Sequence, residues 1–387
     1  MKKKILNLVT ILCLIIGLTG CSPQAASNYV SEIPEAISDA IDYQVARATI
    51  GVPHEAPACS NDKYAYGTLN DEERLVYNQI LDAIRNRTDE VPLSTKSVDV
   101  VKRVYNCVLA DYGDLFWISG YEYQVYYRRN HPIGVTFSAS YYMTPETQAQ
   151  YQSDIDAVVA QWVAEAPKDG SDYAKAKYVY ERLITNVDYD MDSPNNQNII
   201  SVFLGGATVC QGYADAVNVL LQALGIQSVI VTGEANNESH AWNMVRLDGD
   251  YYYMDVTWGN SRYLNADATE GNMINYAYLN VTSEEIAQTH HNQVVFELPD
   301  CTAVKCNYYN QEQRYFTELD IDAIGTVFTE AYEGGSDIVS VKFAGNELYQ
   351  QALDYFLTQG RFVDYCPGLR SIGYIESQEM SVLTFMF

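Results

Sequence analysis

Positive charge is scarce in this sequence. Its 387 residues include 24 Lys and Arg against 50 Asp and Glu, which gives a formal net charge of −26. A surface with this charge repels phosphate backbones and anionic lipid headgroups. The composition therefore argues against a nucleic-acid partner.

Long hydrophobic runs are also missing after the N-terminus, where residues 5–18 follow three lysines. A basic start and a short apolar stretch predict an export signal over residues 1–20, because the stretch is marginal for a permanent membrane span. It closes on LTGC at 18–21, which resembles the bacterial lipobox. The resemblance implies that Cys21 is lipidated, so we expect an extracytoplasmic lipoprotein anchored at the cell membrane.

Cysteine is too sparse for a disulfide framework. Of eight cysteines, Cys13 leaves with the signal and Cys21 would carry lipid. Six remain: Cys59, Cys107, Cys210, Cys301, Cys306 and Cys366. Keeping one free for chemistry leaves an odd number, and the spacing is wide, so pairing stays open even though export permits disulfides.

Aromatic residues are abundant, with 33 tyrosines, which excludes a disordered chain. We expect a tether or irregular linker at 21–66, an N-terminal helical and β region at 67–170, a core at 171–292 and a small α+β domain at 293–387. Helical periodicity and caps predict helices at 70–87, 97–110, 144–164, 172–186, 320–332 and 346–357. Alternating segments predict strands at 115–118, 122–127, 134–142, 338–343, 370–376 and 380–385.

A mostly apolar helix is predicted to begin at Cys210 and to end at Gly225. Its polar residues form one stripe: Gln211, Asp215, Asn218 and Gln222. A thiol in the first turn lies near unpaired backbone N–H groups and the positive end of the helix dipole, and both favour the reactive thiolate. The same N–H groups, including that of Cys210, could stabilise an oxyanion.

A β-hairpin is predicted around Asp248–Gly249, because Asp-Gly between strand-forming segments favours a two-residue turn. This turn places Asp255 opposite Trp242, with His240 two residues further along the same face. His240 and Asp255 are then diagonal neighbours, within reach of a hydrogen bond.

A thiol at a helix start, with a histidine and an aspartate on adjacent strands, is what thiol acyl chemistry requires. The chain resembles the transglutaminase-like superfamily of cysteine acyltransferases and peptidases at three motifs in the order Cys, His, Asp. These are VCQGYA at 209–214, SHAWN at 239–243 and DVTWG at 255–259. Many members have glycine two residues before the cysteine, where this chain has Thr208.

The resemblance implies a papain-like α+β core in which a Cys-bearing helix packs on an antiparallel sheet. By this resemblance Cys210 is the nucleophile, His240 the general base and acid, and Asp255 the partner that orients His240. Trp242 and Tyr189 are expected walls of the substrate site, with plain packing as the alternative for Trp242. Neither a cofactor nor a metal is expected.

Two metal patterns in the sequence do not fit their sites. Residues 188–192 resemble the start of a calcium loop, but Ser193 and Ile199 stand where glycine and glutamate are needed. His290 and His291 do not match a common zinc spacing with the cysteines that follow, so we interpret them as part of a solvated loop.

The sequence thus predicts a surface-anchored cysteine enzyme acting on amide bonds of a protein or peptide. Water or an amine could resolve the thioester. We favour a peptidase or amidase over a crosslinking transglutaminase, because no amine-binding element is identifiable. The alternative is a catalytically silent fold that serves as a cell-surface binding protein. A carbohydrate-binding role for the Tyr-rich flanking regions stays open.

Overall fold

The computed structural model describes residues 50–60, 62–128, 130–168, 170–260 and 273–387, together with residues 44 and 48. The predicted signal peptide at 1–20 and the predicted lipidation site Cys21 lie outside the described residues, as does 21–43 of the predicted tether. Within the described part of the chain, every helix is too short or too polar to cross a membrane.

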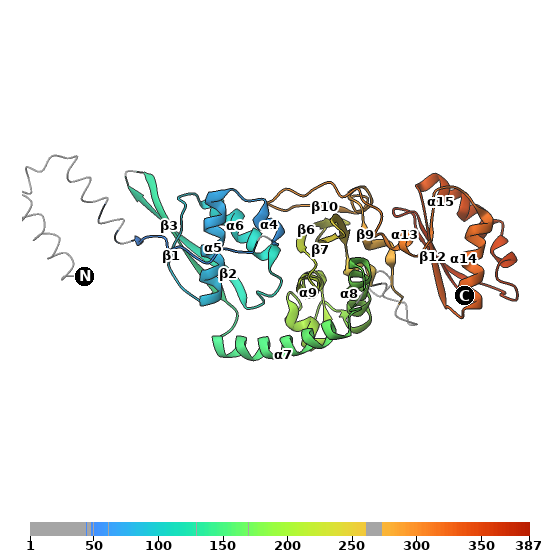
Figure 1. Cartoon of the computed structure of the whole chain (residues 1–387), viewed down its shortest axis with the longest axis horizontal. Coiled ribbons are helices and arrows are strands. Elements are labelled where there is room, and N and C mark those ends of the chain that lie inside the picture. The colour runs from blue at the N-terminus through green and yellow to red at the C-terminus, as the bar shows by residue number, and fades with distance from the viewer. Residues whose placement is uncertain are drawn as a thin grey trace, which may run out of the picture.

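The N-terminal unit packs two helices against a small antiparallel sheet at one end of the molecule (Figure 1). Helix α5 (Asp71–Asn86) begins with a capping box, in which Asn70 accepts from the backbone N–H of Glu73 and the Glu73 carboxylate accepts from that of Asn70. The other elements are α4 (Tyr64–Gly67), β1 (Val91–Pro92), α6 (Val98–Asp111), β2 (Ile118–Arg128) and β3 (His131–Tyr141), in the sheet order β1-β3-β2.

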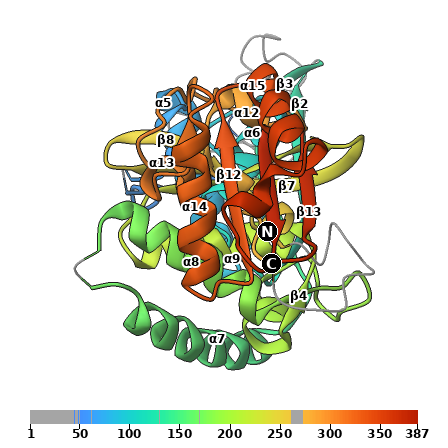
Figure 2. The same ribbon diagram turned by 90° about the vertical axis from the view of Figure 1, so that its right-hand side faces the viewer.

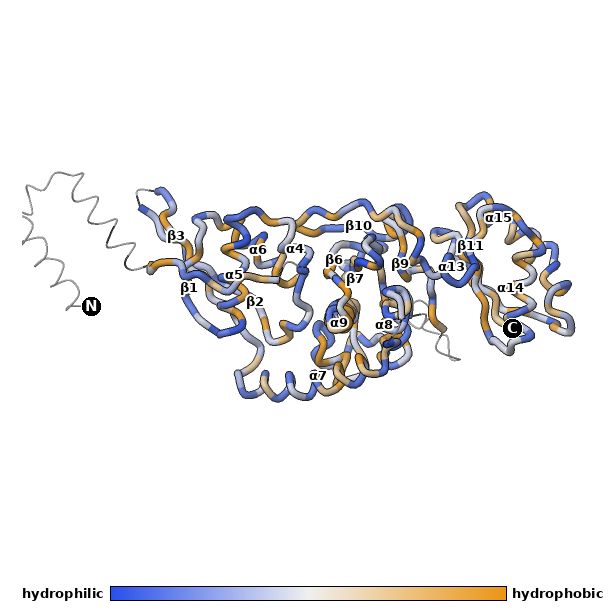
Figure 3. The backbone as a smooth tube through the Cα atoms, in the orientation of Figure 1, coloured by the Kyte–Doolittle hydropathy of each residue, from blue (hydrophilic) through white to orange (hydrophobic). Residues whose placement is uncertain are grey.

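Helix α7 (Pro145–Glu165) runs along one side of the molecule from the N-terminal unit to the central unit (Figure 1). Hydrophobic and hydrophilic residues both occur along its length (Figure 3), and only Ile155 and Trp162 of this helix are buried. It is therefore largely a solvent-exposed connector.

The central unit is an antiparallel five-stranded sheet with α9 (Cys210–Ala223) packed against β6 and β7. The strand order is β10-β6-β7-β8-β9. Its strands are β6 (Ser228–Ala235), β7 (Glu238–Leu247), β8 (Asp250–Met254), β9 (Leu279–Val281) and β10 (His290–Asn292). The remaining elements are α8 (Asp172–Asn186), β4 (Asp188–Tyr189), η1 (Ser201–Gly205), β5 (Ala207–Thr208), α10 (Val256–Gly259), η2 (Tyr276–Tyr278), α12 (Ser283–Ile286) and α13 (Tyr308–Gln311).

The C-terminal unit is a four-stranded sheet with helices on it, and Figure 2 views the molecule from this end. Its elements are β11 (Tyr315–Phe316), α14 (Ile321–Glu333), β12 (Ile338–Phe343), α15 (Asn346–Leu353), η3 (Asp354–Thr358), η4 (Arg361–Asp364), β13 (Gly373–Ser377) and β14 (Val382–Met386). Most of its core is separate from a continuous core that the N-terminal and central units share, although Met380 and Val382 belong to the shared core. Buried residues up to Tyr309 pack with the central unit.

Helices and antiparallel sheets thus make an α+β fold with a Cys-bearing helix on a sheet, as the sequence predicts. The six cysteines within the described residues are all unpaired, and four of them are buried. The pair that is closest in sequence, Cys301 and Cys306, is among the unpaired ones.

Candidate active site

The start of α9 places Cys210 at the open end of a helix that is otherwise mostly buried. A Cβ on Gly212 would lie 2.0 Å from Thr208 Oγ1, so glycine is needed for the chain before the helix to fold back onto its first turn. The Thr208 hydroxyl is held there, donating to the carbonyl of Asn196 at 2.9 Å. Cys210 is the first residue of the helix, and it is half-buried.

The hairpin has the register that the Asp248–Gly249 turn predicts. Leu247 pairs with Asp250, and the ladder runs to the pair Asn243 and Met254. Positive φ angles at Asp248 (52°) and Gly249 (97°) match a type I′ turn. Asp255 therefore lies one residue beyond the last pair, where the chain leaves the sheet.

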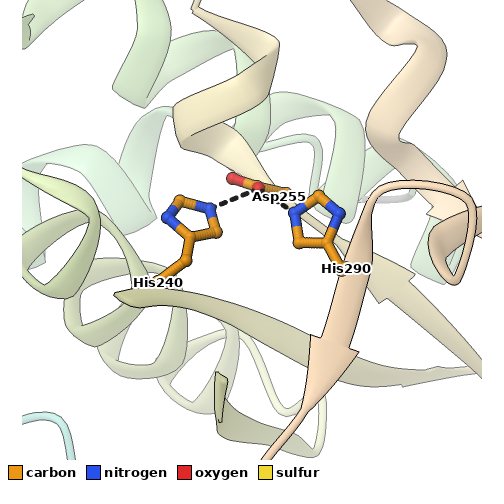
Figure 4. Close-up of side chains that lie close together, drawn as sticks. All are labelled: His240, Asp255 and His290. Carbon is orange, nitrogen blue, oxygen red and sulfur yellow. Dashed lines mark hydrogen bonds and ion pairs between the residues drawn. The ribbon is translucent and has the colours of Figure 1, made fainter. Parts of the chain in front are cut away.

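Asp255 uses its two carboxylate oxygens differently. Oδ1 caps helix α10 by accepting from the backbone N–H of Trp258 at 3.1 Å. Oδ2 lies 2.7 Å from Nε2 of His240 (Figure 4). The cap thus fixes the orientation in which the carboxylate meets the imidazole.

His240 joins the carboxylate to the thiol. Cys210 lies close enough to the imidazole to contribute to the raised pKa of His240. Because Nε2 faces Asp255, Nδ1 is the nitrogen that remains for the thiol. The structure therefore brings together the three residues that the sequence motifs single out.

His290 is a second histidine on the same carboxylate, and sequence reasoning missed it. Its Nε2 lies 3.0 Å from Asp255 Oδ2 (Figure 4), and its Nδ1 lies 2.7 Å from Thr289 Oγ1. The interpretation of this histidine as part of a solvated loop is wrong, because β10 pairs with the edge of β6 and turns His290 inward and His291 outward.

One weak signal for this contact exists in the sequence. Gly233 lies in the interior of β6, within a segment rich in β-branched residues, and a Cβ there would lie 2.0 Å from the backbone carbonyl oxygen of His291. Glycine inside a strand marks a close approach of another backbone. Gly233 thus indicates that another backbone segment lies close to this strand, but it does not identify that segment.

The electrostatics of the site favour an ion pair. Burial opposes the charge on Asp255, but His240 and His290 outweigh it and hold the pKa of this carboxyl well below its usual range. Burial likewise opposes the charge on His240, but the Asp255 carboxylate and the neighbouring Cys210 raise its pKa well above the usual range. The imidazole is thus a strong proton acceptor next to a thiol.

Trp242 and Tyr189, the expected walls of the substrate site, lie in different environments. Trp242 is 1% exposed, and its ring stacks with His240 at 5.7 Å and packs edge-on against His290 at 4.9 Å. This is the packing role that the sequence analysis kept as its alternative. Tyr189 is half-buried and pairs with Thr208 in a short parallel ladder next to the segment that leads into Cys210.

His240, Asp255 and His290, all buried, are the one group of possible metal ligands among the described residues. Donor atoms of His240, Asp255 and His290 lie within 4.8 Å of one another. However, both imidazoles approach one carboxylate oxygen at hydrogen-bond distances of 2.7 and 3.0 Å. The geometry therefore suits a shared hydrogen-bond network.

Residues 159–256 match the family model of the transglutaminase-like superfamily. A comparison with curated proteins found no match.

Several solved structures are similar to the chain at low identity. A TGase shares 16% identity, covering 40% of this chain and 47% of its own, with a TM-score of 0.27. A candidate cysteine protease from Cytophaga hutchinsonii shares 17%, covering 35% of this chain and 61% of its own, with a TM-score of 0.24. Menin, described with its binding site for the MLL protein, shares 16%, covering 58% of this chain and 56% of its own, with a TM-score of 0.25.

The chain thus spans about half the length of the TGase that it matches, 47%. At these identities and TM-scores the family assignment rests on the sequence match and on the three linked motifs. Cys210, His240 and Asp255 all fall inside the matched range, whereas His290 lies beyond it. Residues 159–256 are therefore similar to the transglutaminase-like superfamily, within a longer chain.

Proposed function

We propose that the chain is a cysteine acyl-transfer enzyme that acts on amide bonds of proteins or peptides, mainly as a peptidase or amidase. The observation that carries the proposal is the 2.7 Å contact between Asp255 and His240, with Cys210 at the start of α9 close enough to influence the pKa of the imidazole. A nucleophile, a base and a group that orients the base are the minimum set for this chemistry.

The reaction begins when His240 takes the proton of the Cys210 thiol. The thiolate attacks the amide carbonyl carbon, and the backbone N–H of Cys210 donates to the oxyanion that forms. His240 then gives its proton to the leaving nitrogen, and the C–N bond breaks. The amine departs, and the acyl group stays on Cys210 as a thioester. Asp255 stays ionised and keeps the imidazole oriented throughout.

The second half of the reaction releases the acyl group. Water gives a proton to His240 and attacks the thioester carbonyl, and the C–S bond breaks to yield a carboxylic acid and the free thiol. An amine in place of water would give a new amide bond, which is the crosslinking outcome. We retain hydrolysis as the main outcome, because water is the default acceptor.

Two parallel reactions of one peptide mixture test the proposal. The protein is incubated with a proteome-derived peptide library in heavy-oxygen water, and separately with dansylcadaverine as a soluble primary amine. Hydrolysis predicts heavy oxygen in new carboxyl groups, and transamidation predicts dansyl-labelled peptides. Both products should vanish in the Cys210→Ala variant.

The outcomes separate an enzyme from a silent binding protein. A hydroxylamine-sensitive acyl adduct on the peptide that contains Cys210 would support the thioester. The absence of an adduct and of both products, with alkylation of Cys210 no faster than that of Cys366, would contradict the enzyme and favour a binding protein. The slow alkylation would show that the thiol itself is inactive.

We further propose that the enzyme is extracytoplasmic and is anchored to the cell membrane by lipid on Cys21. The motif LTGC at 18–21 supports this proposal. In bacteria supplied with an alkyne-tagged fatty acid, the full chain should take up the tag and partition with membranes. The Cys21→Ala variant should do neither, and equal labelling of both chains would contradict the anchor.

A further inference from the structure

A cavity of about 890 Å³ lies between the N-terminal unit and the first turns of the helix that carries Cys210. Gln211 and Asp215 of α9 form part of its wall, and Gln211 directly follows the nucleophile. Tyrosines of the N-terminal unit and α7, among them Tyr105 and Tyr151, also line it. The acyl chemistry proposed above makes no use of this space.

The polar stripe of α9 divides into two parts with different surroundings. Towards the end of the helix, Asn218 accepts from the backbone N–H of Gly113 at 3.1 Å, and Gln222 donates to the carbonyl of Asp111 at 2.9 Å. These two residues dock the N-terminal unit onto the helix. Towards Cys210, the amide of Gln211 donates to Oδ1 of Asp215 at 2.8 Å, so these two residues bond with each other.

Asp215 is a carboxyl group without a cation. It is 8% exposed, and apart from Gln211 its side chain has no hydrogen-bond or ion-pair partner among the described residues. The described residues that line the cavity include no lysine, arginine or histidine. Burial, together with the nearby charge of Asp114, raises the pKa of Asp215 well above its usual range.

We propose that this cavity is a specificity subsite that takes a cationic group of the substrate, a primary ammonium or a guanidinium, with Asp215 as its anionic partner. The proposal rests on the acyl-transfer function above and names a chemical class for its substrate. A cation beside Asp215 would restore the ionised carboxylate and form a charge-assisted hydrogen bond in a site shielded from water. The tyrosines would pack against the methylene stem of the basic side chain.

The distance along the helix fits such a substrate. Asp215 lies five residues after Cys210, and α9 rises roughly 1.5 Å per residue, so the two are about 7.5 Å apart along its axis. An extended peptide advances about 3.4 Å per residue. A basic side chain one or two residues from the reacting carbonyl therefore spans this axial distance, and Gln211, next to Cys210, lines the cavity. The cation could equally belong to an amine that accepts the acyl group.

Matched peptide amides test the proposal on the full chain. Four peptides differ at the positions flanking the reacting amide, which carry lysine, arginine, norleucine or glutamate. The wild type should prefer the basic peptides over norleucine by about 10-fold in kcat/KM, mainly through KM, which corresponds to roughly 1.4 kcal/mol. In Asp215→Asn this ratio should fall towards one, whereas it should be unchanged in Asp154→Asn, which alters an exposed acid on α7.

A second arm locates the cation. One outcome is that Asp215→Asn lowers the incorporation of dansylcadaverine while the wild type and the variant each turn over basic and norleucine peptides with equal kcat/KM. In that case the subsite takes the acceptor amine. Equal turnover of basic and norleucine peptides by the wild type, with amine incorporation equal in the two proteins, overturns the proposal. The preference for basic peptides is measured on the wild type alone, so this part of the test does not depend on how the variant folds.

A binding measurement separates this proposal from the proposed function. Calorimetry with Cys210→Ala compares the lysine and norleucine peptides without any turnover. Tighter binding of the lysine peptide, abolished by adding Asp215→Asn, supports the subsite even if no peptide is cleaved. Equal binding, together with equal amine incorporation by the wild type and Asp215→Asn, overturns the subsite and leaves the acyl chemistry to its own test.

Discussion

The side-chain amide of Asn243 donates a hydrogen bond to the backbone carbonyl of Ala214 at 2.9 Å. Asn243 lies on β7, three residues after His240, and Ala214 lies on α9, four residues after Cys210. One buried hydrogen bond therefore ties the strand that carries the base to the helix that carries the nucleophile. The asparagine of the SHAWN motif has this alignment role.

Asn243→Ala should weaken this alignment. The loss of a buried hydrogen bond predicts a decrease of about 1–3 kcal/mol in the free energy of unfolding, measured by urea denaturation. It should also slow alkylation of Cys210 in the folded protein. Asn292→Ala, which changes an exposed amide on β10, is the control. Unchanged alkylation in a destabilised Asn243→Ala protein would show that the hydrogen bond stabilises the fold without aligning the site.

Alkylation of Cys210 at neutral pH should be faster than that of Cys59 and Cys366. The reason is that Asp255 raises the pKa of His240, so the imidazole carries a positive charge beside the thiolate. His240→Ala should move the pH profile towards that of a free thiol. Peptide mapping gives the rates, with Cys59 and Cys366 as internal references. An unchanged profile in His240→Ala would contradict the triad.

His290→Ala should lower kcat by about 10-fold with a smaller change in KM, because losing one of the two donors to Oδ2 loosens Asp255 behind His240. His290→Gln keeps a donor of similar reach and should recover part of the activity. The pH profile of Cys210 alkylation should shift in the alanine variant, which a purely structural role would not cause. His291→Ala, at the exposed neighbouring position, should match the wild type in both measurements.

The free energy of unfolding should fall as the pH rises above neutrality. The pKa of His240 is raised in the fold above its unfolded value of about 6.5, so its contribution is complete below that pH and is lost as the pH rises through the folded value. Urea denaturation of the wild type and His240→Gln should therefore give a difference that shrinks with increasing pH. A constant difference would contradict the ion pair.

Gly212→Ala should disrupt the first turn of α9, because its Cβ would collide with Thr208 Oγ1. We expect lower thermal stability and slower Cys210 alkylation. Adding Thr208→Gly removes the obstructing hydroxyl and introduces the glycine that many members of the family have at this position. The double variant should therefore regain part of the thermal stability and part of the rate of Cys210 alkylation. If the second change brings no recovery, the collision is not the cause.

Local signals in the sequence predicted much of this fold. Asn70 capped a helix at the expected residue, the helix at 172–186 has the predicted bounds, and Asp248–Gly249 fixed the hairpin register. Each of these depends on neighbours within a few residues. The helix expected at 346–357 instead ends at Leu353 and continues as a π-helical turn, a change that no cap or breaker announces.

The candidate site divides in the same way. The three motif residues could be predicted because a turn and a helix start place them. His290 could not, because its position depends on the pairing of β10 with β6 across more than fifty residues of chain. Two adjacent histidines carry no information about which strand edge they join.

The position of β9 and β10 sets the smallest fragment that can hold this site. A fragment ending at residue 256, where the family match ends, would contain Cys210, His240 and Asp255 but neither β9 nor β10. It would leave both β6 and β8 as open edges and would expose the side of Asp255 that His290 now covers. The unit of homology is therefore smaller than the unit of folding.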